Sequence, residues 1–258
     1  MGQFKQDKIY GVFSSQEIKK VGTGTTTRKT VSKIFWFVEE NEDGSITVQS
    51  INANYVPTGV KKTITKEVLL EKYSPEPEFY ASSVYPKMKE LNDTLDSADE
   101  SRKNGETFSA EFKYNHALKI DVANVRANFG IGLTYLERGD AEKAKNIFQR
   151  LVNLEGAYSE EHKHLFNEFG INLRKSKMFA QAVEYYNRAL NLNKSDENLF
   201  INLARVYLEQ KQYDSCFEAL SAALELSPKH EIATKFVVWM KDKSLITPKQ
   251  FEEVQKFI

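Results

Sequence analysis

The sequence repeats itself with a fixed period between Lys163 and His230, and no other feature constrains the fold as strongly. When Lys163–Asp196 is aligned with Glu197–His230, which begins 34 residues later, large residues meet large ones and small residues meet small ones without a gap. Apolar residues recur every three or four positions in two runs per unit, as expected for two amphipathic helices joined by a turn. A period of this length predicts an array of stacked helical hairpins. The matched pairs are Phe166 with Phe200, Phe169 with Leu203, Gly170 with Ala204, Leu173 with Tyr207, Ala182 with Cys216, Tyr186 with Leu220 and Ala189 with Ala223.

The same unit extends toward the amino terminus in two further copies, residues 91–124 and 125–158, where equivalent residues again lie 34 positions apart. Between the second and third units the equivalent alanines Ala144 and Ala182 are 38 positions apart, so the register slips by four. Four residues make about one helical turn. We therefore expect Ser159–His162 to lengthen the following helix at its amino end without rotating its apolar face.

Two of the units carry a distinctive set of small, aromatic and proline residues. These are Gly132, Tyr135, Gly139, Asp140, Ala144 and Phe148 in one unit, and Ala204, Tyr207, Ala223 and Pro228 in another. The set resembles the tetratricopeptide repeat, and the resemblance covers about 140 residues. It implies a mainly α fold, an α-α superhelix of about four repeats with the bounds 91–124, 125–158, 163–196 and 197–230. The sequence departs from the family at the position where tryptophan is usual, which holds Thr94, Asn128, Phe166 and Phe200.

Residues 1–75 differ in composition from the repeats, and we identify no family resemblance for them. The turn signal Glu42–Ser45 separates an apolar run from the alternating segment Ser45–Ile51, which predicts a β-hairpin or small meander. We also expect a strand at Lys61–Thr65 and a short helix capped by Thr65. Because the strands carry apolar residues on both faces, one face must pack on further structure, and we expect the first helices of the array to provide it.

Proline-rich and capping signals divide the chain. The sequence Ser74–Pro77 breaks the short helix and predicts a boundary between a small β-rich domain, 1–75, and a linker with a lead-in helix, 76–90. At the other end, residues 231–258 predict two capping helices that cover the exposed end of the array. The last of them opens with a capping box in Thr247–Gln250.

The composition restricts the class of partner and the compartment. The chain holds 36 basic and 36 acidic side chains, and a formal charge of zero argues against a protein that coats nucleic acid or an anionic membrane. A single cysteine cannot form an internal disulfide, which is typical of the cytoplasm. The first residues lack the apolar run of a secretory signal, and the apolar stretches are far shorter than a membrane-spanning helix needs.

In tetratricopeptide proteins the first helix of each repeat lines a concave groove, and the resemblance implies the same arrangement here. The inward positions include asparagines, whose amides offer both a donor and an acceptor to an extended peptide, and arginines that could bind a carboxylate through two parallel hydrogen bonds. We therefore predict an intracellular adaptor or scaffold that binds a partner peptide or helix in this groove. The alternative is a set of solvated helix faces with no dedicated ligand. The groove positions are Arg126, Phe129, Leu133, His164, Asn167, Glu168, Ile171, Arg174, Asn198, Ile201, Asn202 and Arg205.

A second candidate site lies in the basic stretch Gly22–Lys33, which holds no acidic residue. Its glycines would let backbone amides turn toward an anion, and its hydroxyl and basic side chains would add donors. The stretch predicts either a regulatory site for a phosphate-bearing small ligand, whose state the repeats relay, or a loop before an edge strand whose lysines discourage pairing. The possible anion-binding residues are Gly22, Gly24, Thr25, Arg28 and Lys29.

The sequence holds no nucleophile elbow, paired metal motif or phosphate-transfer motif, so we predict a binding protein rather than an enzyme, with no cofactor and no metal. His164 and Glu168 lie one helical turn apart, but no second cluster completes a metal site. Cys216 occupies a small position between helices and is predicted to be buried rather than reactive. Trp36 and Trp239 lie in apolar runs and are predicted core residues.

Overall fold

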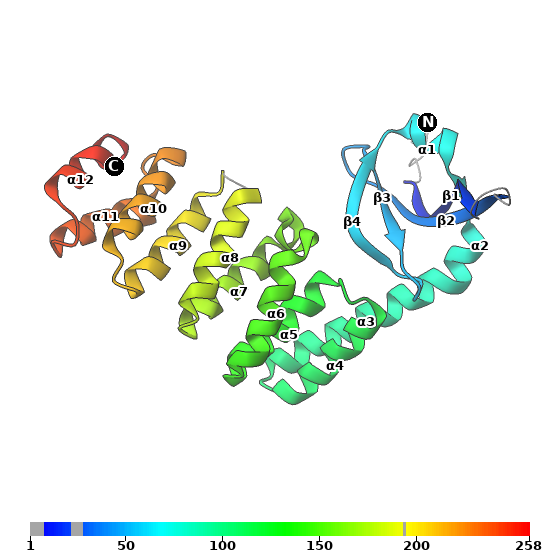
Figure 1. Cartoon of the computed structure of the whole chain (residues 1–258), viewed down its shortest axis with the longest axis horizontal. Coiled ribbons are helices and arrows are strands. Elements are labelled where there is room, and N and C mark those ends of the chain that lie inside the picture. Colours follow the sequence, from blue (N-terminus) through cyan, green and yellow to red (C-terminus); the bar gives the residue numbers. More distant parts are fainter. Residues whose placement is uncertain (1–7, 22–27, 193–194) are drawn as a thin grey trace, which may run out of the picture. The chain divides into compact units, whose positions relative to one another are not determined.

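The computed structural model describes residues 8–21, 28–192 and 195–258 of the chain (Figure 1). The chain divides into two compact units, Met1–Gly130 and Ile131–Ile258. The predicted boundary near residue 75 lies inside the first of these units, because the strands and the first helical hairpin pack into one body. As a domain boundary it stays a prediction.

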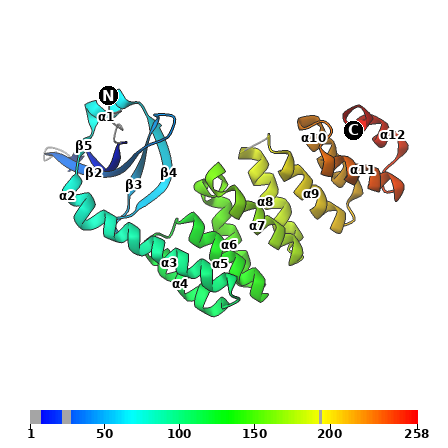
Figure 2. The ribbon, with the colours of Figure 1, turned by 180° about the vertical axis from the view of Figure 1, so that it is seen from behind.

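The helices follow the predicted order from one end of the repeat region to the other. They are α1 (Lys66–Lys72), α2 (Pro77–Phe79), the π-helix η2 (Tyr80–Val84), α3 (Tyr85–Lys103), α4 (Thr107–Ile120), α5 (Val125–Arg138), α6 (Ala141–Asn153), the 3-10 turns η3 (Glu155–Tyr158) and η4 (Glu160–His162), α7 (Lys163–Lys175), α8 (Phe179–Leu192), α9 (Glu197–Glu209), α10 (Tyr213–Leu226), α11 (Glu231–Asp242), α12 (Pro248–Val254) and the 3-10 turn η5 (Gln255–Phe257). The four predicted hairpins are α3–α4, α5–α6, α7–α8 and α9–α10, and Figure 2 shows them as successive pairs of antiparallel helices. The mainly α fold with a small sheet before it is confirmed.

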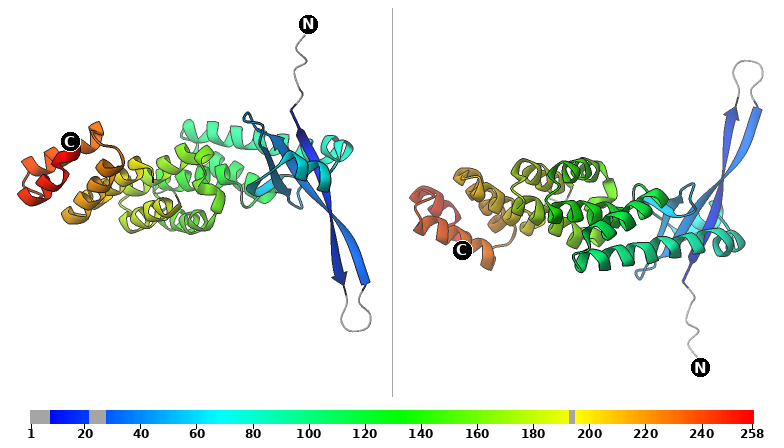
Figure 3. Two further views of the ribbon diagram at one scale, coloured as in Figure 1. Left: turned by 90° about the horizontal axis from the view of Figure 1, so that it is seen from above. Right: turned by 90° about the horizontal axis from the view of Figure 1, so that it is seen from below.

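The strands form one antiparallel sheet in the first unit, in the order β4-β3-β2-β1-β5. They are β1 (Tyr10–Val21), β2 (Arg28–Glu40), β3 (Ile46–Ile51), β4 (Pro57–Ile64) and β5 (Ser74–Pro75). β1 and β2 pair from Tyr10 with Glu39 to Val21 with Arg28, and they continue as a two-stranded ribbon past the rest of the sheet (Figure 3). We did not predict β1, because Ser14–Glu17 interrupts its apolar pattern with polar residues.

Both faces of the sheet are covered. On one face, Val38 packs with Leu69 of α1 in a buried cluster, and Thr65 caps α1 as predicted by accepting a hydrogen bond from Val68 N. On the other face, Phe37 packs with Val84, just before α3. This face therefore packs on η2 and the start of α3, in the lead-in segment before the first repeat, and docking on the first helices of the array itself stays a prediction.

The loop between β3 and β4 holds the sheet to the end of α4. Asn52 Nδ2 donates to the carbonyl of Ile120 at 3.0 Å, and Asn54 Nδ2 donates to the same oxygen at 2.8 Å. The first residue after the helix, Asp121, accepts a hydrogen bond from Thr58 Oγ1 at 2.7 Å. The last carbonyls of a helix lack partners within the helix, so these side chains satisfy them and join the sheet to the first hairpin.

Small residues permit close packing of helices, both within a hairpin and between successive hairpins. Gly170 of α7 lies against the ring of Tyr186 of α8, and a Cβ at Gly170 would lie 2.5 Å from the Tyr186 hydroxyl oxygen. A Cβ at Gly132 of α5 would lie 2.7 Å from the ring of Phe169. These glycines therefore permit close packing that a side chain would prevent.

The expected extension of α7 is wrong. Ser159 has an extended backbone, and η4 separates it from α7, which begins at Lys163. The Ser159 hydroxyl lies 2.8 Å from His162 Nδ1 and 3.0 Å from the carbonyl of Gly156. Such local bonds from a serine compete with helix formation, so the four inserted residues form a tight turn instead of a helical overhang.

The two carboxyl-terminal helices pack on the fourth repeat. Val237 and Met240 of α11 share a buried cluster with Ile201 of α9 and Leu220 of α10. The predicted capping box is present at the start of α12. The prediction that Trp239 is a core residue is wrong, because its side chain is 41% exposed. Trp36, on the sheet, is half-buried and donates a hydrogen bond to Ser15 Oγ.

Candidate peptide-binding site

The predicted groove positions of the second unit come mainly from α7 and α9, the first helices of the third and fourth repeats. Their exposed or half-buried members are His164, Asn167, Glu168, Ile171, Arg174, Asn198 and Arg205. Asn202 is 9% exposed, at the edge of the buried core. These residues give the surface of α7 and α9 polar and basic groups.

Three of the predicted groove residues must be corrected. Phe129, Leu133 and Ile201 are at most 2% exposed and belong to the hydrophobic core. The repeat pattern assigned them to the inward face of their helices, but large apolar residues at these positions pack between helices instead. They offer no surface to a ligand.

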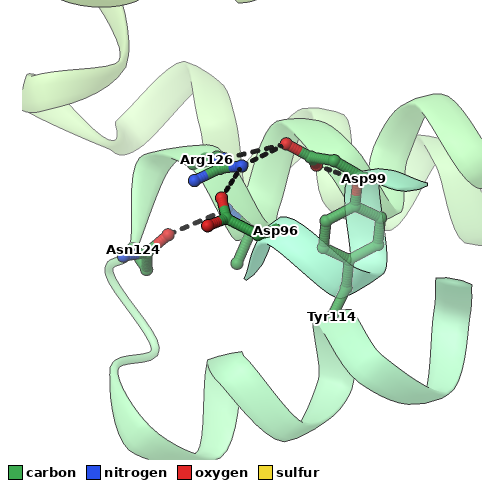
Figure 4. Close-up of polar contacts among 6 residues, drawn as sticks. Asp96, Asp99, Tyr114, Asn124 and Arg126 are labelled. Atoms are coloured by element: carbon green, nitrogen blue, oxygen red, sulfur yellow. Dashed lines mark hydrogen bonds and ion pairs between the residues drawn. The ribbon is translucent and has the colours of Figure 1, made fainter. Parts of the chain in front are cut away.

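Arg126, in the first unit, is held by acidic residues of its own chain (Figure 4). Its Nε and Nη2 donate to Asp99 Oδ2 at 2.9 and 2.6 Å, and Nη2 also donates to Asp96 Oδ1 at 2.7 Å. Tyr114 donates its hydroxyl to the other oxygen of Asp99. Burial lowers the pKa of Arg126, but the hydrogen bonds and charges of the two carboxylates outweigh burial and raise the pKa above its ordinary value. Two carboxylates therefore compensate this arginine, which leaves no reason to assign it a ligand.

Arg174 is compensated in a similar way within the second unit. Its Nη1 forms an ion pair with Glu209 Oε1, so that α7 and α9 are joined across the first helices of two repeats. The pairing leaves Arg174 as a link between helices rather than an available cation.

Arg205 of α9 differs from the other two arginines. Its Nη1 donates to Asn202 Oδ1 at 3.1 Å, and among the described residues no carboxylate forms an ion pair with it. Its guanidinium lies close enough to Tyr186 to lower the pKa of that hydroxyl, although burial of the ring has the larger effect and raises the pKa overall. Arg205 is thus a fixed, uncompensated positive charge.

Asn167 of α7 carries an unusual amide. Its Oδ1 is buried, and within the described part of the chain no donor forms a hydrogen bond with this oxygen. A buried acceptor without a partner costs about 1–3 kcal/mol. The amide can remove this cost by turning toward a donor from outside the chain.

Three residues of α11, which was predicted only as a capping helix, occupy the same repeat positions as predicted groove residues of α9. Residues 34 positions after Asn198, Asn202 and Arg205 are Ile232, Phe236 and Trp239. All three lie on α11 and are exposed or half-buried. The 34-residue period contained this signal, because α12 also begins 35 positions after α10, but the two helices were interpreted only as a cap and the register was not continued into them.

The structure describes only part of the predicted anion-binding site. Gly22, Gly24 and Thr25 lie outside the described residues, while Arg28 and Lys29 pair through the backbone with Val21 and Lys20, so the anion site stays a prediction.

In the described ranges, no group of three or more His, Cys, Asp or Glu side chains could hold a metal ion. Cys216 is buried, and burial raises the pKa of its thiol to about 12, in accord with the predicted packing role. None of the helices in the described ranges is both long enough and apolar enough to cross a membrane.

Comparisons with known proteins agree with the repeat geometry. Residues 126–155 match a tetratricopeptide repeat model, and residues 165–250 match the fourth ARM domain of tetratricopeptide repeat protein 21. The chain is 23% identical over 269 residues to TPR repeat-containing protein MJ1428 of Methanocaldococcus jannaschii, covering 92% of this chain and 46% of that protein. It is 31% identical over 104 residues to Hsp70/Hsp90 co-chaperone CNS1 of Saccharomyces cerevisiae, covering 38% of this chain and 27% of that protein.

The chain therefore spans less than half the length of these two curated relatives. Among solved structures, the crystal structure of MamA protein has 22% sequence identity and a TM-score of 0.46, covering 64% of this chain and 90% of that one. The four hairpins, their 34-residue period and the matching family models lead to one conclusion. The helical hairpins of this chain are repeats of the tetratricopeptide type.

Proposed function

We propose that the chain is a protein-binding scaffold and that its second unit holds an extended segment of a partner protein against α7 and α9. The observation that carries this proposal is Arg205, a positive charge that no carboxylate of the described chain compensates, beside a surface rich in asparagine. The other two arginines among the predicted groove residues, Arg126 and Arg174, form ion pairs with acidic residues of the chain. Arg205 is therefore the one of the three that can offer its charge to a partner.

The roles of the side chains follow from their chemistry. Arg205 binds a carboxylate of the partner, and its hydrogen bond to Asn202 fixes the orientation of the guanidinium before binding. Asn167 turns its unpaired amide oxygen to a backbone N–H of the partner. Asn198 and His164 are exposed on the same helices and add further polar contacts.

The test is affinity capture from the native cell, with quantitative mass spectrometry of the retained proteins, using the full chain and single variants. Arg205→Ala and Asn167→Ala should each lose the proteins that the unchanged chain retains. Arg188→Ala is the matched control, because it removes an exposed arginine from α8, the second helix of the third repeat. If all three variants retained the same proteins as the unchanged chain, the assignment of the binding surface would be refuted.

A further inference from the structure

Helix α11 exposes an apolar stripe that its packing does not explain. Ile232 is 46% exposed and Trp239 is 41% exposed, while Phe236 lies between them in the helix and is half-buried. The rings of Phe236 and Trp239 are close, with centroids 6.1 Å apart. The three residues are spaced by four and three positions, so they lie on one face of the helix.

Most of the stripe lies outside the face that α11 uses to pack, because of its three residues only Phe236 also packs against the buried cluster of the fourth repeat. Val237 and Met240 are fully buried with residues of α9 and α10, and Met240 Sδ lies 3.6 Å from the Cys216 sulfur. Ala233 is buried in the same cluster. The cluster therefore fixes the helix against the fourth repeat with the stripe on an open side.

The register of the repeats places this stripe beside the proposed peptide site. Ile232, Phe236 and Trp239 stand where the previous repeat has Asn198, Asn202 and Arg205, respectively. A helix that only closes a repeat array carries polar residues on its outer surface. Large apolar residues that are grouped and exposed instead mark an interaction surface.

We propose that α11 extends the peptide-binding surface and forms an apolar subsite next to Arg205. The subsite accepts a large aromatic or aliphatic side chain of a peptide whose carboxylate is bound by Arg205. This inference rests on the proposed function of α7 and α9, and it adds the chemical class of the ligand.

The spacing of the two ligand groups follows from helix packing. Neighbouring helices lie about 8–10 Å apart, and an extended chain advances about 3.3 Å per residue. The acidic residue and the apolar residue of the ligand should therefore be about three positions apart. Arg205 should select an acidic residue of the peptide, because among the described residues no carboxylate forms an ion pair with it. Lys235, next to Phe236 in α11, already forms an ion pair with Glu231 at 2.5 Å.

The experiment is a selection from a displayed library of random linear peptides on the immobilised full chain. The unchanged chain should enrich peptides that combine Asp or Glu with Phe, Tyr, Trp, Leu or Ile at the stated spacing. One enriched peptide is then made synthetically and titrated against Trp239→Ala, Ile232→Ser and Arg205→Ala. Trp239→Ala should weaken its binding by at least about tenfold, because aromatic anchors dominate binding energy.

Two controls separate the inference from the proposed function. Phe112→Ala, which removes an exposed aromatic side chain of the first unit, should bind the peptide like the unchanged chain. If the acidic preference depends on Arg205 but the apolar preference survives both α11 variants, the subsite is wrong and the proposed function stands. If no enriched peptide depends on Arg205, the proposed function fails and the subsite fails with it. An unchanged melting temperature in each variant excludes loss of folding as the cause.

Discussion

Gly170 of the third hairpin has no room for a side chain. An alanine would place a methyl carbon 2.5 Å from the hydroxyl oxygen of Tyr186, which is buried and has little room to move. Overpacking of this kind costs about 1–3 kcal/mol. We expect Gly170→Ala to lower the free energy of unfolding by that amount, measured by urea denaturation.

The fourth repeat supplies the compensating change. It holds Ala204 and Leu220 where the third repeat holds Gly170 and Tyr186. The double variant Gly170→Ala/Tyr186→Leu should therefore be more stable than the sum of the two single changes predicts. Strictly additive effects in this double-mutant cycle would contradict the close approach of the two side chains.

Asp121 gives a prediction about pH at the junction of the sheet and α4. Burial raises its pKa above the ordinary value of 3.8, although hydrogen bonds from Thr58 and Ala123 act in the opposite direction. A raised pKa means that the folded state binds the proton more tightly, so this contribution to stability is present below pH 3.8 and is lost as the pH rises through the folded value. Asp121→Asn keeps an oxygen acceptor and removes the charge.

We therefore expect the stability of Asp121→Asn relative to the unchanged chain to increase between pH 4 and pH 7, measured by urea midpoints at each pH. Asp121→Ala, which also removes the acceptor, should be less stable than Asp121→Asn at every pH. A difference that does not vary with pH would show that the carboxylate is not desolvated by the fold.

The packing environment of some side chains could be predicted from the sequence, and that of others could not. The period correctly marked Gly170 as a small position, but it did not indicate that the ring of Tyr186 is what lies against it. Trp239 was assigned to the core because it belongs to the apolar run Phe236–Met240. Five consecutive residues of a helix point to all of its sides, so some of them must face outward. The exposure of Trp239 follows from that geometry.

At the scale of single elements, α4 carries two aromatic residues whose side chains are largely exposed. Phe108 and Phe112 are 75% and 76% exposed. Phe112 also lines a cleft between α3 and α4. Five of the six residues at the equivalent positions of the other repeats are polar: Glu142 and Asn146, Ala180 and Glu184, Asp214 and Glu218.

We expect Phe112→Glu to change the free energy of unfolding by less than about 0.5 kcal/mol, because surface substitutions away from special features have small effects. Phe169→Ala is the comparison, since Phe169 is fully buried and its loss should cost about 3–5 kcal/mol. Chemical denaturation of both variants makes the measurement. A large loss in Phe112→Glu would mean that the ring packs in the folded chain more than its exposure indicates.

Element bounds were predictable where side-chain signals are local. Thr65 and Thr247 cap their helices as their spacing from the next apolar run indicates. The bonds of Ser159 to Gly156 and His162 are also local, but counting residues per turn did not include them. The partners of Arg126 could not be derived from a pattern, because Asp96 and Asp99 precede it by about 30 residues and reach it only after α3 and α4 have packed.

At the scale of the whole molecule, the repeat region is stabilised mainly by contacts between successive helices, whereas the sheet has cores of its own. In repeat proteins each unit contacts its neighbours, so stability is a sum of local terms rather than one global quantity. Leu220 is fully buried in the carboxyl-terminal cluster, and Val38 is fully buried in the sheet. The two residues therefore report on different units.

Leu220→Ala should lower the local free energy of unfolding by about 2–5 kcal/mol. Hydrogen exchange followed by mass spectrometry should show this loss as faster amide exchange in α9–α12. The amides of β1–β4 should exchange at an unchanged rate in this variant, because no part of the sheet belongs to the cluster that contains Leu220. Val38→Ala is the reciprocal control and should accelerate exchange in the sheet while leaving α9–α12 unchanged. Equal acceleration in both units by either variant would mean that helix α5, which crosses the boundary at Gly130, transmits unfolding from one unit to the other.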